Sequence, residues 1–225
     1  MAGGRSIWPW LAVAGLVAAF LAVGHGHGDH DADARSTAPH STAAPTTSAP
    51  TRSATPDPTR SATPDPNDPA QFAGPVVTYA RQAGVHAQLL MAILYNESYK
   101  PHDPAFERAW QKSKPDAAFG IANMHRAAFD DTKRGRPFAN RSWEELPDHP
   151  DLAIQAAAWY LHDLQAQLPA HRTGAYTTDQ LLALGYNTGT GNMRLFAEGT
   201  SPGSQARSYL DTLRGNWSKA AQALK

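Results

Sequence analysis

The chain has 225 residues and no cysteine. Without cysteine no disulfide can stabilise a domain, so stability must come from a hydrophobic core. The sequence also lacks a His-Glu-x-x-His motif, so it gives no support to that class of zinc hydrolase. Neither sign of charge dominates, because residues 71–225 hold 16 Lys and Arg against 14 Asp and Glu without a basic block. We therefore expect no nucleic-acid partner.

The histidines of residues 71–225 do not suggest a metal site either. They show no metal-ligand spacing along the sequence: His86, His102, His125, His149, His162 and His171. The glycine-spaced histidines of residues 25–31 fit a polar spacer better than a metal site. We expect no bound metal and no cofactor.

The first 28 residues contain a 17-residue apolar run, Ile7–Val23, preceded by a single positive charge at Arg5. Its length lies between that of a secretory signal and that of a membrane span. Small residues after the run favour cleavage, whereas Trp8 and Trp10 favour an uncleaved anchor at a membrane interface. Both alternatives export the chain. We expect an extracytoplasmic protein, either secreted or anchored to the membrane.

Residues 35–70 hold 8 Pro and 13 Ser or Thr and no aromatic residue, and the eight residues 51–58 are repeated as 59–66. Such a segment cannot bury enough apolar surface to offset its chain entropy. In extended polyproline geometry it could reach ~110 Å. Residues 29–70 are therefore predicted to be a disordered linker, which leaves 71–225 as one folded domain.

That domain is predicted to be mainly α, because no strand-period run in it exceeds four or five residues. Asp68-Pro69 predicts a helix start and Gly84 its end. Thr177 and Gln180 form a capping box for a helix through Leu184. Further helices are expected around residues 89–99, 106–110 and 123–132, from 149 or 150 to 168, from 204 to a stop at Gly215, and over 217–224.

Glu97 is the most informative residue of the domain. Apolar residues precede it by three, four and seven positions, so in a helix it lies on the stripe that should face the core. Pro101 should end this helix near Tyr99, which places Glu97 near the negative end of the helix dipole. Burial and dipole should both raise its pKa, as a general acid requires. The alternative is a structural carboxylate that reaches solvent or Arg81.

Two uncharged, glycine-containing segments could contact a sugar. In residues 117–124, Gly120 permits close backbone approach and the Asn123 amide both donates and accepts hydrogen bonds. In residues 184–192, Tyr186 and Asn187 are expected on a glycine-rich turn. The alternatives are a buried connection capped by Asn123 and a turn that merely ends a helix.

Three segments, in this order, resemble the catalytic domain of soluble lytic transglycosylases, a lysozyme-like family that acts on peptidoglycan. Ile93 to Ser98 resembles the helix that ends in the family's catalytic Glu-Ser pair. Residues 118–124 resemble its Gly-Leu-Met-Gln segment, and residues 185–189 its Ala-Tyr-Asn-x-Gly segment. The helix over residues 154–164 matches the one between them, and the resemblance covers roughly 72–215.

The resemblance implies a lytic transglycosylase with Glu97 as its single acid/base. The enzyme would cleave the β-1,4 bond between N-acetylmuramic acid and N-acetylglucosamine and form a 1,6-anhydro product. The glycan strand, the expected partner, would meet these residues: Ser98, Gly120, Ile121, Asn123, Tyr160, Tyr186 and Asn187. For Tyr160, core packing is the competing interpretation, because aromatic residues at helical spacing usually fill a core.

Three departures from the family pattern keep alternatives open. Asn123 stands where the family usually has Gln, Ala122 replaces a larger residue, and the connection over 98–120 is longer than usual. The changes at Asn123 and Ala122 allow a tethered peptidoglycan-binding module without activity. Phe119 to Ile121 is also similar to goose-type lysozymes, which implies a muramidase as the second alternative. Asp103 and Asp116 are the nearest carboxylates that could position a water molecule.

Overall fold

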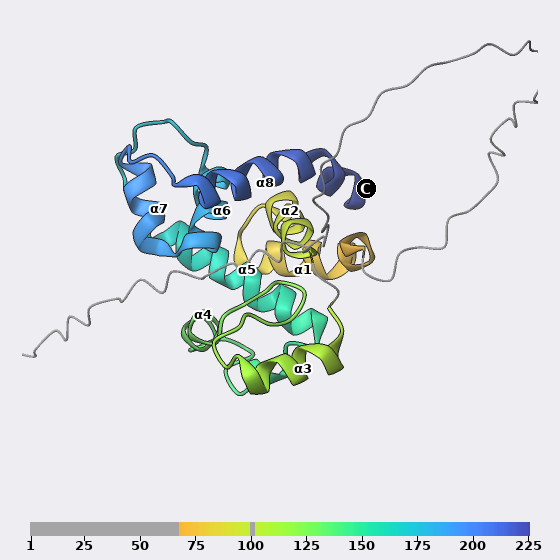
Figure 1. The fold of residues 1–225 in the computed structure, drawn as a ribbon. Helices are drawn as coiled ribbons and strands as arrows, with labels where there is room; N and C mark the ends of the chain where they lie inside the picture. Colours follow the sequence, from red (N-terminus) through yellow and green to blue (C-terminus); the bar gives the residue numbers. More distant parts are fainter. Residues whose placement is uncertain (1–67, 100–101) are drawn as a thin grey trace, which may run out of the picture. The chain divides into compact units, whose positions relative to one another are not determined.

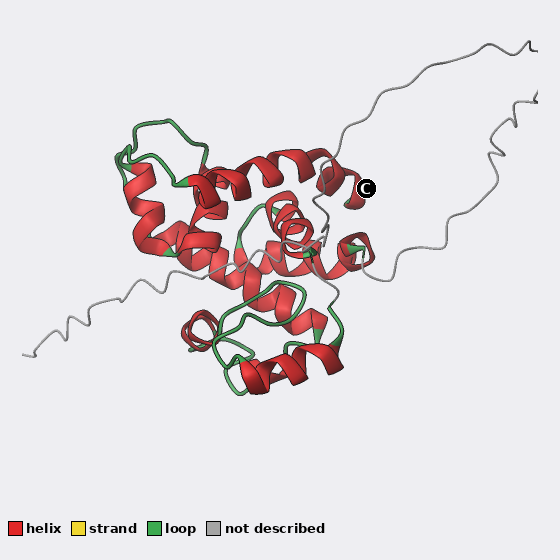
Figure 2. Ribbon diagram, in the orientation of Figure 1, coloured by secondary structure: helices red, strands yellow, loops and turns green. Residues whose placement is uncertain are grey.

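The computed structural model describes residues 68–99 and 102–225, which form helices joined by loops (Figure 1, Figure 2). The described helices are η1 (Pro69–Phe72), α1 (Ala73–Ala83), α2 (Ala87–Glu97), α3 (Pro104–Ser113), α4 (Arg126–Thr132), η2 (Trp143–Glu145), α5 (Pro150–Ala166), α6 (Thr178–Thr188), α7 (Thr190–Ala197) and α8 (Ser204–Ala223). The prediction of a mainly α fold is confirmed. The predicted export segment and linker lie almost entirely outside the described residues. Within those residues, none of the helices is both long and apolar enough to cross a membrane.

Helix α2 forms the centre of the domain. Every residue from Leu89 to Glu97 is buried, so the helix is enclosed around its whole circumference. It packs against α8 on one side and α1 on another (Figure 1). Helices that are apolar all round are buried all round, which is why this one carries a near-continuous apolar sequence rather than a single stripe. Glu97 is therefore buried together with the eight residues that precede it in the helix.

The predicted helix starts and stops are largely observed. The Asp68 Oδ1 accepts a hydrogen bond from the Ala70 backbone N at 3.0 Å, with Pro69 in the first helical position. The first turn is the 3-10 helix η1, and Gly84 ends α1 with a φ of 68°. The capping box of α6 also forms, since the Gln180 backbone N donates to Thr177 Oγ1 at 3.2 Å. Local signals thus set these helix ends.

Two expectations about the C-terminal third are wrong. Gly215 does not stop a helix, because α8 continues through it and buries Leu213 before it and Ala220 after it. Packing of that apolar face outweighs the cost of one glycine, which is about 1 kcal/mol. Tyr186 and Asn187 lie on helix α6 rather than on a turn, since α6 continues to Thr188.

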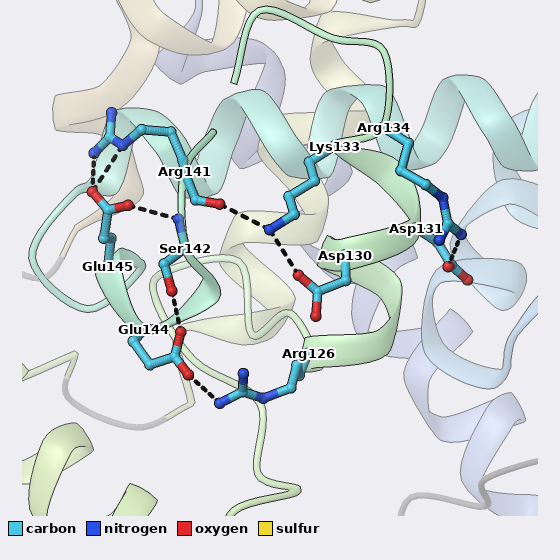
Figure 3. A network of polar contacts seen from close by, with 9 residues as sticks. All are labelled: Arg126, Asp130, Asp131, Lys133, Arg134, Arg141, Ser142, Glu144 and Glu145. Atoms are coloured by element: carbon cyan, nitrogen blue, oxygen red, sulfur yellow. Dashed lines mark hydrogen bonds and ion pairs between the residues drawn. The ribbon is translucent and has the colours of Figure 1, made fainter. Parts of the chain in front are cut away.

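A polar network holds the segment that follows α4 (Figure 3). Lys133 Nζ donates to the Arg141 carbonyl at 3.0 Å and pairs with Asp130 at 3.0 Å. Arg141 Nε donates to Glu145 at 2.8 Å, and Glu144 pairs with Arg126. Exposed ion pairs each contribute only about 0–1 kcal/mol, so the network stabilises this segment through the sum of its contacts. Its effect is to fix η2, which carries Trp143.

Candidate active site

Glu97 ends α2 with its carboxylate held between two elements distant in sequence. The residue is 9% exposed. Its Oε2 accepts a hydrogen bond from Asn123 Nδ2 at 3.0 Å, and its Oε1 accepts one from the Tyr209 hydroxyl at 2.9 Å. Asn123 comes from the loop before α4 and Tyr209 from α8. Both of these donors are neutral groups, an amide and a phenol, and each hydrogen bond favours the ionised form of the carboxylate.

Tyr209 is a site residue that the sequence analysis missed. Burial and the charge of Glu97 raise the pKa of Tyr209 well above its usual value, so the hydroxyl stays neutral and donates. The Tyr209 carbonyl accepts a hydrogen bond from Asn96 Nδ2 at 3.0 Å, and Asn96 Oδ1 accepts one from Asn216 Nδ2 at 2.9 Å. These bonds fix α8 to the end of α2. No local motif marks Tyr209, because its role depends on that packing.

The loop that carries Asn123 is a tight turn, as the glycine at its start requires. Phe119 and Met124 exchange backbone hydrogen bonds at 3.1 and 3.0 Å, and the Asn123 N donates to the Gly120 O at 2.9 Å. Gly120 has a φ of 71°, and a Cβ there would lie 2.9 Å from the Leu146 carbonyl oxygen. Only glycine fits such a position. Asn123 has a φ of 47°, a conformation that asparagine tolerates better than most residues.

Side chains from other elements donate hydrogen bonds to backbone carbonyls of this turn. The Tyr186 hydroxyl, on α6, donates to the Ala122 carbonyl at 2.6 Å, and Trp143 Nε1 donates to the Met124 carbonyl at 2.7 Å. The rings of Tyr160 and Tyr186 lie 5.5 Å apart. Burial raises the pKa of Tyr186 well above its usual value and that of Tyr160 to about 12, so both stay neutral.

The other residues predicted for the site take different positions. The Ser98 hydroxyl donates to the Tyr95 carbonyl at 2.9 Å at the end of α2, and Ser98 and Ile121 line one small pocket together with His102. Asn187 is exposed on α6, and the described contacts do not join it to Glu97. The structure therefore brings Asn123 to Glu97 directly, places Gly120 and Ile121 in the same turn, and leaves Asn187 apart.

The two aspartates proposed for positioning a water molecule have other roles in the described contacts. Asp103 Oδ1 accepts a hydrogen bond from the Phe106 backbone N at 2.7 Å and thereby caps α3. Asp116 is exposed, and its carbonyl oxygen lies 2.9 Å from the His125 Nδ1. Neither aspartate has a described contact with Glu97.

Three further features do not provide a competing site in the described residues. Gly199 to Gly203 matches a Gly-x-Ser-x-Gly pattern, but Ser201 is exposed in the loop between α7 and α8, whereas the serine-hydrolase elbow joins a strand to a helix. No group of three or more His, Asp or Glu in residues 68–99 and 102–225 is arranged to hold a metal ion. A hollow beside Tyr79 and His149 contains none of the predicted site residues.

Comparison with known proteins assigns the family. The family model described as "Transglycosylase SLT domain" matches residues 75–205, more than half of the chain, and the chain belongs to this family. Its domain is lysozyme-like, and its members act on the cell wall. The chain is thus a glycan-cleaving enzyme of the lytic transglycosylase kind, with peptidoglycan as its substrate and an extracytoplasmic place of action. A search of curated proteins finds no match.

Proposed function

We propose that the protein is a peptidoglycan lytic transglycosylase in which Glu97 is first the general acid and then the general base. The arrangement that carries this proposal is the buried Glu97 carboxylate between Asn123 and Tyr209. Glu97 would protonate the glycosidic oxygen between N-acetylmuramic acid and N-acetylglucosamine as that bond breaks. The carboxylate would then take the proton of the muramic 6-hydroxyl, whose oxygen bonds to C1 and closes the 1,6-anhydro ring.

The anhydro outcome follows from the family resemblance, which implies that no second protein carboxylate acts as a nucleophile. Glycosidases that use a nucleophile or activate water commonly place a second carboxylate opposite the acid. Glu107 is the other buried carboxylate of the described residues, and both of its oxygens are engaged, by His102 and by the Gly120 backbone N. Glu107 is therefore held by other groups, and the muramic 6-hydroxyl would serve as the nucleophile.

Asn123 would also bind the sugar. Its Oδ1 is buried and has no hydrogen-bond partner among the described residues. An unpaired buried acceptor costs about 1–3 kcal/mol, which an N–H or O–H of the glycan would recover. Ser98, Gly120 and Ile121 would lie along the same wall, while Tyr160 and Tyr186 would support the turn.

The first prediction tests the acid. Glu97→Gln should lower the rate of digestion of purified sacculi by at least about 10²-fold, because general acid–base catalysis contributes that much or more. Glu198→Gln, at an exposed carboxylate after α7, is the control and should digest at the wild-type rate. Wild-type digestion by Glu97→Gln would refute the proposal.

Product analysis separates the alternatives. Mass spectrometry of the released muropeptides should show anhydro products, lighter by one water than the products of a muramidase. A binding module without activity would instead sediment with sacculi and release no soluble fragments. Export through residues 1–28, either as a cleaved signal or as an anchor through residues 7–23, is part of the same proposal.

A further inference from the structure

Glu107 is a buried carboxylate that the proposed reaction does not use. It lies on the first turns of α3 and is 2% exposed. Its Oε1 lies 3.0 Å from the Nδ1 of His102, and its Oε2 accepts a hydrogen bond from the Gly120 backbone N at 2.9 Å. Burial of a charge is unfavourable unless the charge is paired and hydrogen-bonded. These two contacts supply the partner and the hydrogen bond that a buried carboxylate needs.

The contacts of Glu107 connect it to Glu97 through a continuous chain of hydrogen bonds. Glu107 holds the N–H of Gly120, and the carbonyl of Gly120 accepts the N–H of Asn123 at 2.9 Å. The side chain of Asn123 then donates to Glu97 Oε2 at 3.0 Å. Each step is a direct contact, so a shift of Gly120 is passed on to the amide that touches the acid.

The turn needs such support because its backbone is unusual. Asn123 has a φ of 47°. A non-glycine residue with positive φ is strained and persists only where its surroundings impose that conformation. Three side chains hold the turn: Tyr186, Trp143 and Glu107. Of these, only Glu107 forms a charge-assisted bond, which is about twice as strong as a neutral one.

We propose that Glu107, together with His102, is a positioning residue that sets the amide of Asn123 against the carboxylate of Glu97. His102 is the partner of Glu107 in this pair, and its side chain is also buried, with only 9% exposed. The consequence for the reaction, which rests on the proposed function, is that Glu107 affects turnover rather than glycan binding.

The kinetic test compares three variants on soluble glycan fragments. Glu107→Ala should lower kcat by about 10²-fold with KM little changed, since a misplaced catalytic geometry has that cost. Glu107→Gln keeps an oxygen for the Gly120 N–H and should recover most of the rate. Ala109→Gly, at an exposed position of α3, weakens the same helix without touching the contacts of Glu107 and should leave kcat unchanged. A KM effect alone, or equal losses in Glu107→Ala and Ala109→Gly, would overturn the proposal.

A second readout does not depend on activity. The ionisation of Glu97 is followed by NMR of its side-chain carboxyl carbon in the wild type, Asn123→Ala, Glu107→Ala and the double variant. Loss of the Asn123 hydrogen bond raises the pKa of Glu97, because that bond favours the ionised form. Glu107→Ala should also raise the pKa of Glu97, by less than Asn123→Ala because the lost negative charge acts in the opposite direction, and the double variant should not exceed Asn123→Ala. Removal of a nearby negative charge alone would shift the pKa down, so Glu107→Gln should not reproduce the rise.

The two readouts separate the failure of this inference from failure of the proposed function. Additive shifts, or no shift in Glu107→Ala, would contradict the positioning role even if the enzyme cleaves peptidoglycan. Coupled shifts in a protein that cleaves nothing would instead refute the transglycosylase proposal and leave the positioning role standing. If Glu107→Ala does not fold, Glu107→Asp keeps the charge but shortens the reach by one methylene, and the same coupling is expected of it.

Discussion

At the scale of single residues, the acid–base behaviour of Glu97 depends on the groups that contact its carboxylate. Glu97 has two neutral donors on its oxygens, from Asn123 and Tyr209, and its charge is felt by Tyr186. Burial and the charge of Glu97 raise the pKa of both tyrosines well above their usual value near 10. Loss of activity in mildly alkaline solution would therefore report the ionisation of Glu97, since these tyrosines stay protonated there.

The second prediction concerns the donor that local sequence did not reveal. Tyr209→Phe removes a hydrogen bond to the ionised form of Glu97, so the pKa of Glu97 should rise. The alkaline limb of kcat should move up by about one to two pH units, because such a bond contributes about 1.5–3 kcal/mol and one unit is about 1.36 kcal/mol. Kinetics from pH 4 to pH 9 measure this. An unchanged limb would show that the contact does not govern the acid.

At the scale of helices and turns, two glycines with different surroundings give the third prediction. Gly215 lies in α8, and a Cβ at this position would have nothing within 4 Å, so Gly215→Ala should raise the free energy of unfolding by about 0.5–1 kcal/mol. Gly185 lies where α6 meets α7, and a Cβ there would be 2.8 Å from Met193 Sδ. Gly185→Ala should destabilise by about 1–3 kcal/mol. Urea denaturation measures both, and equal effects would contradict this packing.

The fourth prediction concerns Asp68, which joins three helices. It caps η1, accepts the Tyr95 hydroxyl of α2 at 2.9 Å and lies 3.8 Å from Lys219 Nζ of α8. Burial opposes its ionisation, but the hydrogen bonds of Ala70 and Tyr95 and the charge of Lys219 outweigh burial and lower its pKa. Burial and Asp68 raise the pKa of Tyr95 to about 12, so Tyr95 remains a donor.

A lowered folded-state pKa stabilises the protein above the unfolded value and loses this effect as pH falls through the folded value. The wild type should therefore exceed Asp68→Asn in Tm at pH 6, and the difference should shrink below about pH 4. Thermal unfolding of both proteins between pH 2 and pH 7 measures this. A difference independent of pH would mean that the charge of Asp68 contributes nothing.

At the scale of the whole molecule, the fifth prediction concerns the segment before the domain. Deletion of residues 35–66 should leave cleavage of soluble glycan fragments unchanged and reduce cleavage of intact wall if the domain is tethered to a membrane, because the segment then sets its reach. Release of product from both substrates, compared with the full chain, measures this. Equal loss on both substrates would show that the deleted residues are part of the fold.

Local physics made much of the domain predictable. Helix starts at Asp68 and Thr177 and the stop at Gly84 were found because capping acts within a few residues. Helix α7 (Thr190–Ala197) was not foreseen, and the continuation of α8 through Gly215 was predicted wrongly. In both places a glycine predicts the end of a helix, but packing against neighbouring helices outweighs that preference. The local sequence pattern contains no information about such packing.

The sequence by itself determined a mainly helical domain, a glutamate at the end of a buried helix and the order of motifs typical of the transglycosylase SLT family. The tertiary structure decided how Glu97 is held. Its donors stand 26 and 112 residues away in the chain, and the contact of Glu107 with Gly120 spans 13. Periodicity and capping report neighbours within about one helical turn, so contacts over such separations exist only once the helices have packed.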